Sequence, residues 1–196
     1  MRMQVAGEES MCEVETCLLL PHTVTNLAEF TAHPDRHLVS IEEDPGRAAK
    51  LWFERAAKNP YGGDGVVQIR YFGAHLVPPG AWDDTEAIWT ALLDVLEGFC
   101  STGAGYGSFC AEVTLVGNPH AAEFSVGGVS NRIEPRVFIP AVLDGAKRYF
   151  HWVENMVGRT HPGISERIEA LAGLTDHFSP PRAPANPSAA GRSLDV

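Results

Sequence analysis

The chain has 196 residues, of which 44% are hydrophobic and 20% are charged, and its formal net charge is −10. A chain of this length and hydrophobic content buries a sizeable core, which excludes a wholly disordered protein. Its 15 Lys and Arg residues are scattered, so the concentrated basic face that nucleic acid requires is missing, and we expect no nucleic-acid partner. The sequence also contains no apolar run long enough to span a membrane and no secretory signal pattern, which favours a cytoplasmic protein that binds no membrane.

The two ends of the sequence differ from its middle. We expect residues 1–10 to be flexible. Residues 179–196 hold four prolines among Ala, Ser and Asn, and they offer too few apolar groups to offset the entropy lost on ordering. The sequence therefore predicts a disordered tail at 179–196 and a single α+β domain at 11–178.

In the first half of the domain, strands and helices alternate. Strands are predicted at 12–20, 37–42 and 66–72, and helices at 25–32 and 45–58. Pro21 ends the first strand. Asp44 and Pro45 have the residue types of an N-cap and a first helical position, which predicts the start of the second helix.

The most clearly marked helix is predicted at 83–99. Asp83 and Glu86 have the spacing of a capping box, which places the start of the helix at Asp83. Apolar residues fall on one side of this helix and carboxylates on the other. The segment carries five acids and no Lys or Arg, so its acidic stripe is either solvated or neutralised by positive charge from elsewhere.

In the second half of the domain, a hairpin lies between two long helices. Strands are predicted at 111–116, 121–126 and 136–139, and helices at 140–157 and 164–171. The glycine-rich segment 103–107 is interpreted as a flexible connection. Because this order does not follow a strict βαβ alternation, we predict an α+β fold with a mixed or mostly antiparallel sheet and two long amphipathic helices packed on it.

Motifs for known chemistry are largely absent from the sequence. No serine has the flanking glycines of a nucleophile elbow, and no Walker-type phosphate loop occurs. The glycines at 103–107 follow a helix and precede a strand, which is the reverse of a dinucleotide-binding loop. The four cysteines lack zinc-ligand spacing. We therefore predict no metal, no cofactor and no catalytic residue.

Two arrangements of titratable residues remain open as candidate catalytic sites. His75, His120 and His151 would form an enzyme site if the fold gathered two or more of them in a deep pocket with nearby acids. Glu112 and Glu123 are expected as cross-strand neighbours in the hairpin, where two like charges are unfavourable unless a base lies between them.

The acidic stripe is the strongest candidate for a binding surface. A tryptophan beside acids can anchor a protein interface, so the candidate residues for binding a basic protein partner are Asp83, Glu86, Trp89, Asp94 and Glu97. The sequence favours a small acidic cytosolic binding protein without catalytic activity, such as an immunity- or antitoxin-like inhibitor. The alternatives are a small cytosolic enzyme or biosynthetic accessory protein that acts on a small molecule in a sheet–helix pocket, and a self-associating structural protein.

Overall fold

The computed structural model describes residues 11–21, 24–57 and 63–175. Within these residues the chain forms five α-helices and two antiparallel sheets, which confirms the predicted α+β class. The segments 1–10 and 179–196, which were predicted to be flexible, lie outside the described residues. None of the described helices has both the length and the hydropathy to cross a bilayer.

The first sheet contains the N-terminal strands. Its strands are β1 (Cys12–Leu19), β2 (Leu38–Ser40), β3 (Asp64–Tyr71), β4 (Ala74–His75) and β5 (Asp83–Asp84). The order is β2-β1-β3-β4, and β5 pairs with the start of β3. Val14 lies opposite Ile69 and Thr16 lies opposite Val67, so these four buried side chains share one face of the sheet.

The second sheet is an antiparallel meander. It consists of β6 (Ala104–Ser108), β7 (Glu112–Asn118), β8 (Ala121–Val126) and β9 (Val129–Ile133), in that order. Val113 and Leu115 of β7 are fully buried, and so are Phe124 and Val126 of β8. The side chains between them are more exposed, as expected of a sheet with one face on the core.

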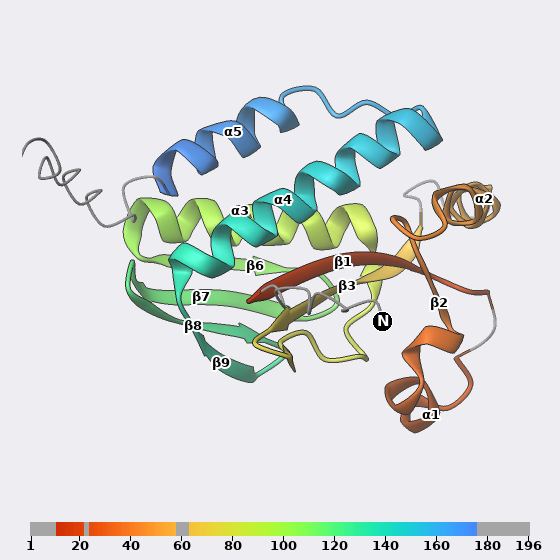
Figure 1. Cartoon of the computed structure of the whole chain (residues 1–196), viewed down its shortest axis with the longest axis horizontal. Coiled ribbons are helices and arrows are strands. Elements are labelled where there is room, and N and C mark those ends of the chain that lie inside the picture. The colour runs from red at the N-terminus through yellow and green to blue at the C-terminus, as the bar shows by residue number, and fades with distance from the viewer. Residues whose placement is uncertain (1–10, 22–23, 58–62, 176–196) are drawn as a thin grey trace, which may run out of the picture.

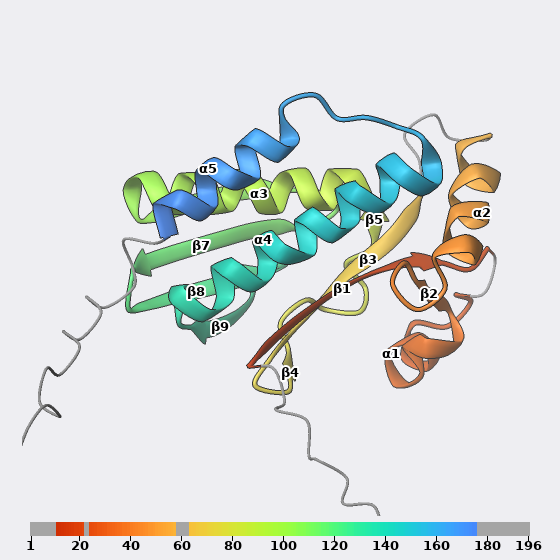
Figure 2. The same ribbon diagram turned by 45° about the horizontal axis from the view of Figure 1, so that its top comes forward.

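The helices are α1 (Leu27–Ala32), α2 (Pro45–Ala56), α3 (Thr85–Thr102), α4 (Pro135–Trp152) and α5 (Ile164–Thr175). A short 3-10 turn, η1 (Pro34–Arg36), follows α1, and a π-helical turn, η2 (Val153–Val157), extends α4. Figures 1 and 2 show α3 and α4 on the same side of the sheets, with α5 lying along both of them.

The core between α3, α4 and β1 is centred on two aromatic rings. Trp89 of α3 is fully buried and stacks on Tyr149 of α4, with 6.0 Å between ring centroids. The Trp89 indole N–H donates to Thr16 Oγ1 at 3.1 Å, and the Tyr149 hydroxyl lies 3.0 Å from Thr85 Oγ1. Both rings therefore bury a large apolar area while their polar atoms keep a partner.

Residues 104–108 form the strand β6 and Gly103 is the C-cap of α3, so the prediction of a flexible connection at 103–107 was wrong. The glycines of β6 allow the strand to lie directly against α3, because a Cβ at Gly105 would lie 1.8 Å from the carbonyl oxygen of Val95. Gly107 is similarly close to Ala91. The pattern of glycines reflects close packing between helix and strand.

The strand predicted at 136–139 is instead the first part of α4, which was predicted to start at Pro140. Pro135 occupies the first turn of this helix, and Pro140 lies inside it. Phe138 and Ile139 are buried on the same arc as the later apolar residues of the helix, so the apolar spacing is helical from the start. The missing N–H of Pro140 removes one hydrogen bond, to the carbonyl of Arg136, near the end where helical bonds are fewest.

Two further predictions were wrong in detail. The N-cap of α3 is Asp84 rather than Asp83, because Oδ1 of Asp84 accepts the hydrogen bonds from the backbone N–H groups of Glu86 and Ala87. In the hairpin, Glu123 lies opposite Val116 on one side and Arg132 on the other. Glu112 lies opposite Ser108, so the two glutamates are not cross-strand neighbours.

Candidate functional site

The outer side of α3 carries four of the five predicted site residues. Asp83 lies in β5 just before the helix, and Glu86, Asp94 and Glu97 lie on the helix itself. Trp89 differs from these four, because its side chain is fully enclosed in the core and presents no surface to a partner. The structure thus gathers the acids along one side and separates the tryptophan from them.

The C-terminal segment of the chain supplies positive charge to these acids. Nη2 of Arg167, on α5, lies 2.6 Å from both Asp94 Oδ1 and Glu97 Oε2. Nη1 of Arg159, which precedes α5, lies 3.0 Å from Glu86 Oε2. Three of the predicted acids are therefore neutralised, at least in part, within the molecule.

The N-terminal half of α3 remains open as a groove, which we call the α3 groove. It has a volume of about 520 Å³, and it is lined by Asp83, Asp84, Glu86, Ala87, Thr90, Ala91, Asp94, Ser108 and Arg159. Ala87 and Thr90 are exposed, so small side chains form the accessible part of the helix surface. Four carboxylates and one guanidinium line this groove, which makes it predominantly acidic.

Asp84 is a partly buried acid of the α3 groove. Its Oδ1 caps the helix by accepting hydrogen bonds from the backbone N–H groups of Glu86 and Ala87, at 2.9 and 3.1 Å. Its Oδ2 is enclosed and has no hydrogen-bond partner among the described residues. Burial raises the pKa of Asp84, and the neighbouring acids Glu86 and Asp83 add to this rise, whereas the two capping bonds oppose it.

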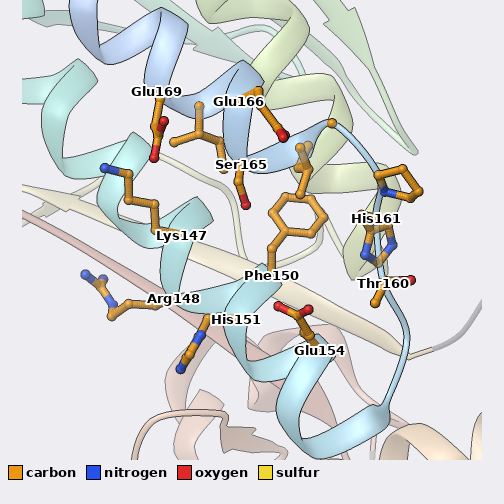
Figure 3. A pocket seen from close by; sticks show the side chains of 14 residues that line it. Lys147, Arg148, Phe150, His151, Glu154, Thr160, His161, Ser165, Glu166 and Glu169 are labelled. Atoms are coloured by element: carbon orange, nitrogen blue, oxygen red, sulfur yellow. The ribbon is translucent and has the colours of Figure 1, made fainter.

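A second cavity, the α4–α5 cavity, lies between these two helices and the segment that joins them (Figure 3). Its volume is about 640 Å³. Phe150 contributes an aromatic surface and is 7% exposed, and the His161 ring meets it edge to face at 5.0 Å between centroids. Ile164 and Ile168 add an apolar wall from α5. The interior of this cavity is thus partly apolar.

The rim of the α4–α5 cavity is charged. Glu154 of η2, Glu166 and Glu169 of α5, and Lys147 of α4 all line it. Within the described part of the chain, none of these four forms an ion pair within 4.0 Å. In Figure 3 the carboxylates of Glu154 and Glu166 lie on either side of the Phe150 ring, and Glu169 points towards Lys147.

The three histidines that could have formed an enzyme site lie in separate places. His75 borders a small pocket beside α1, and His120 lies in the β7–β8 turn. Of the three, His151 lines the α4–α5 cavity, and its Nε2 lies 3.0 Å from Nδ2 of Asn155. Among residues 11–21, 24–57 and 63–175, no group of three or more His, Cys, Asp or Glu is arranged to hold a metal ion.

The cysteines do not form an activated site. Cys12 and Cys17 are buried in β1, Cys100 is partly buried and Cys110 is exposed. Burial raises the pKa of Cys12 to about 11, and the nearby charge of Glu13 adds to this effect. Because the reactive form of cysteine is the thiolate, this environment disfavours Cys12 as a nucleophile.

Sequence reasoning missed Arg159 and Arg167, as well as the whole α4–α5 cavity. The available signal was a set of basic residues close to the predicted helix at 164–171, complementary in charge to the acidic helix at 83–99. Comparisons with protein-family models, with curated proteins and with solved structures find no match for this chain.

Proposed function

We propose that this chain is a binding protein without catalytic activity, and that it docks a basic protein partner in the α3 groove. The observation that carries the proposal is the charge of the α3 groove, which is lined by four carboxylates and one guanidinium. Carboxylates gathered in a groove attract a basic surface. A lysine or arginine of a partner would pair with the accessible carboxylates of this groove.

The charge balance around α3 supports the same proposal. Five carboxylates on or beside the helix meet two arginines from the C-terminal segment, so an excess of negative charge remains. Such a field accelerates the encounter with a basic surface and weakens with salt. An immunity- or antitoxin-like inhibitor would use this surface to cover a basic functional site on its partner.

The test measures the binding of a fluorescent peptide of alternating Arg, Ala and Lys to the full chain at low salt. Thr90→Lys places a cation in the middle of the α3 groove. Ser130→Lys makes the same change of net charge on β9, away from the groove, and is the matched control. We expect Thr90→Lys to weaken binding by roughly tenfold, which is the loss of one favourable charge contact, and Ser130→Lys to change it by less than about twofold.

Equal losses in the two variants would mean that the peptide responds only to net charge, and this would overturn the proposal. The alternative, action on a small molecule in a pocket between sheet and helices, has less support. The histidines singled out for it lie apart, and the larger described cavity lies between α4 and α5.

A further inference from the structure

We propose that the α4–α5 cavity receives one arginine side chain of the basic partner, with the guanidinium held between Glu154 and Glu166 and its stem lying along Phe150. The inference deepens the proposed function and rests on it. It assigns a specific pocket that shares no lining residue with the α3 groove.

The first argument is the position of these two carboxylates. Glu154 and Glu166 both line the α4–α5 cavity and lie on either side of the same ring (Figure 3). Neither forms an ion pair within 4.0 Å with a described residue. A guanidinium between them would satisfy both carboxylates at once.

The second argument is the aromatic surface between the two carboxylates. Phe150 is 7% exposed, and what remains accessible faces a cavity of about 640 Å³. A cation over an aromatic ring is attracted by the ring quadrupole, and a planar guanidinium also stacks on it. Ile164 and Ile168 would contact the methylene stem of the same side chain. The combination of ring, apolar wall and acidic rim fits arginine better than lysine.

The far end of the cavity limits the ligand to one positive charge. Lys147 and Glu154 are seven residues apart, which on a helix is about 10 Å along the axis. A polyamine long enough to reach from one to the other would place a second ammonium near Lys147. The charge pattern therefore favours a single cationic side chain over a free polyamine.

The experiment titrates the full chain with three amides and follows backbone amide shifts by NMR. The probes are Nα-acetyl-arginine methylamide, the matching lysine compound, and the citrulline compound, which has the shape of arginine without its charge. We expect a weak affinity, on the order of millimolar, as is usual for one side chain. We expect arginine to bind several-fold more tightly than lysine and at least about tenfold more tightly than citrulline, with shifts at residues of α4 and α5.

Two double variants then locate the site. Glu154→Gln with Glu166→Gln should weaken arginine binding by roughly tenfold, because both charged acceptors become neutral. Glu54→Gln with Glu112→Gln makes the same change of net charge on α2 and β7, outside the cavity, and should leave the affinity within about twofold.

Three outcomes would overturn the inference: no saturable shift up to about 50 mM arginine amide, equal affinity for citrulline, or unchanged affinity in the Glu154 and Glu166 double variant. Each can be distinguished from a failure of the proposed function. Thr90→Lys changes the α3 groove and should leave the binding of the single amide intact, whereas it weakens the binding of the basic peptide.

Discussion

The acidic residues on the two sides of α5 differ in whether they form ion pairs within the chain. On the side facing α3, Arg167 forms ion pairs with Asp94 and Glu97. On the side facing the α4–α5 cavity, Glu166 and Glu169 line an open space and form no ion pair with a described residue (Figure 3).

The difference separates acids that help to hold α5 on α3 from acids that form no ion pair with a described residue. In the first group the guanidinium is supplied by the chain, and its hydrogen bonds help to fix α5 on α3. Burial alone would lower the pKa of Arg167, but the two carboxylates outweigh that effect and raise it. In the second group no ion pair forms among the described residues, and two of the carboxylates that line the α4–α5 cavity are assigned above to a partner's arginine.

The largest effect should come from Trp89, which the sequence analysis assigned to the acidic binding surface and the structure places in the core. Trp89→Phe removes apolar volume from a fully buried site and leaves Thr16 Oγ1 without its donor. We expect the free energy of unfolding, measured in urea, to fall by about 2–4 kcal/mol. Binding of the basic peptide by the folded variant should be unchanged.

Trp82→Phe is the control for this change, because Trp82 is only partly buried and its ring meets Phe30 near the edge of the core. It should lower the unfolding free energy by less than about 1 kcal/mol. If Trp89→Phe instead abolished peptide binding at unchanged stability, Trp89 would be an interface anchor after all.

The fold was predictable where one local pattern decided an element. The amphipathic period of α3 and the Asp44-Pro45 start of α2 both predicted their helices, and Asp44 does accept a hydrogen bond from the N–H of Arg47. Prediction failed where strand pairing or contacts between distant segments determined the local structure, since pairing with β7 makes residues 104–108 the strand β6. It was also wrong by one residue at the start of α3, where Asp84 rather than Asp83 accepts the hydrogen bonds that cap the helix.

The next effect in size should follow from reversing the charge of Arg167. Arg167→Glu replaces two ion pairs with repulsion from Asp94 and Glu97. These groups are partly exposed, so we expect a loss of about 1–2 kcal/mol of unfolding free energy, which shrinks as salt is added.

Arg47→Glu makes the same change of charge in the first turn of α2, where Arg47 has no ion pair with a described residue, and should stay within about ±0.5 kcal/mol. Equal effects of the two reversals at all salt concentrations would show that α5 is held by its apolar contacts alone.

A smaller effect is expected at Asp84, where capping and burial oppose each other. Asp84→Ala removes the acceptor for two backbone N–H groups and should cost about 1 kcal/mol, whereas Asp84→Asn keeps the cap. Because the folded state raises the pKa of Asp84 above its ordinary value of 3.8, the folded chain binds the proton more tightly than the unfolded chain.

The contribution of Asp84 to stability is therefore full below pH 3.8 and is lost as the pH rises through the folded pKa. Denaturation of the wild type and of Asp84→Asn across this range checks the sign. The difference in favour of asparagine should grow as the pH rises, and a difference that shrinks would contradict the raised pKa.

The candidate site could be predicted only in part, because its ion pairs join residues that lie far apart in the sequence. The acids of α3 are visible in one short segment, but the arginine that reaches Asp94 follows it by 73 residues. No local pattern states which helix will lie beside which. The unpaired state of Glu154 and Glu166 depends equally on the final position of α5.

The smallest expected effect tests most directly whether the acids on the two sides of α5 differ in their contribution to stability. Asp94→Asn with Glu97→Gln, and Glu154→Gln with Glu166→Gln, remove the same two negative charges from a chain of net charge −10. The first pair weakens the contacts of Arg167 and should cost about 0.5–1 kcal/mol at low salt. The second pair has no ion pair to lose among the described residues and should change stability by less than about 0.5 kcal/mol, in the stabilising direction because self-repulsion falls.

Since the net charge of the two variants is identical, any difference between them in urea denaturation reports local pairing alone. Equal losses in both would mean that the acids of the cavity are also tied to the fold, and they would then not be free to receive a partner's arginine.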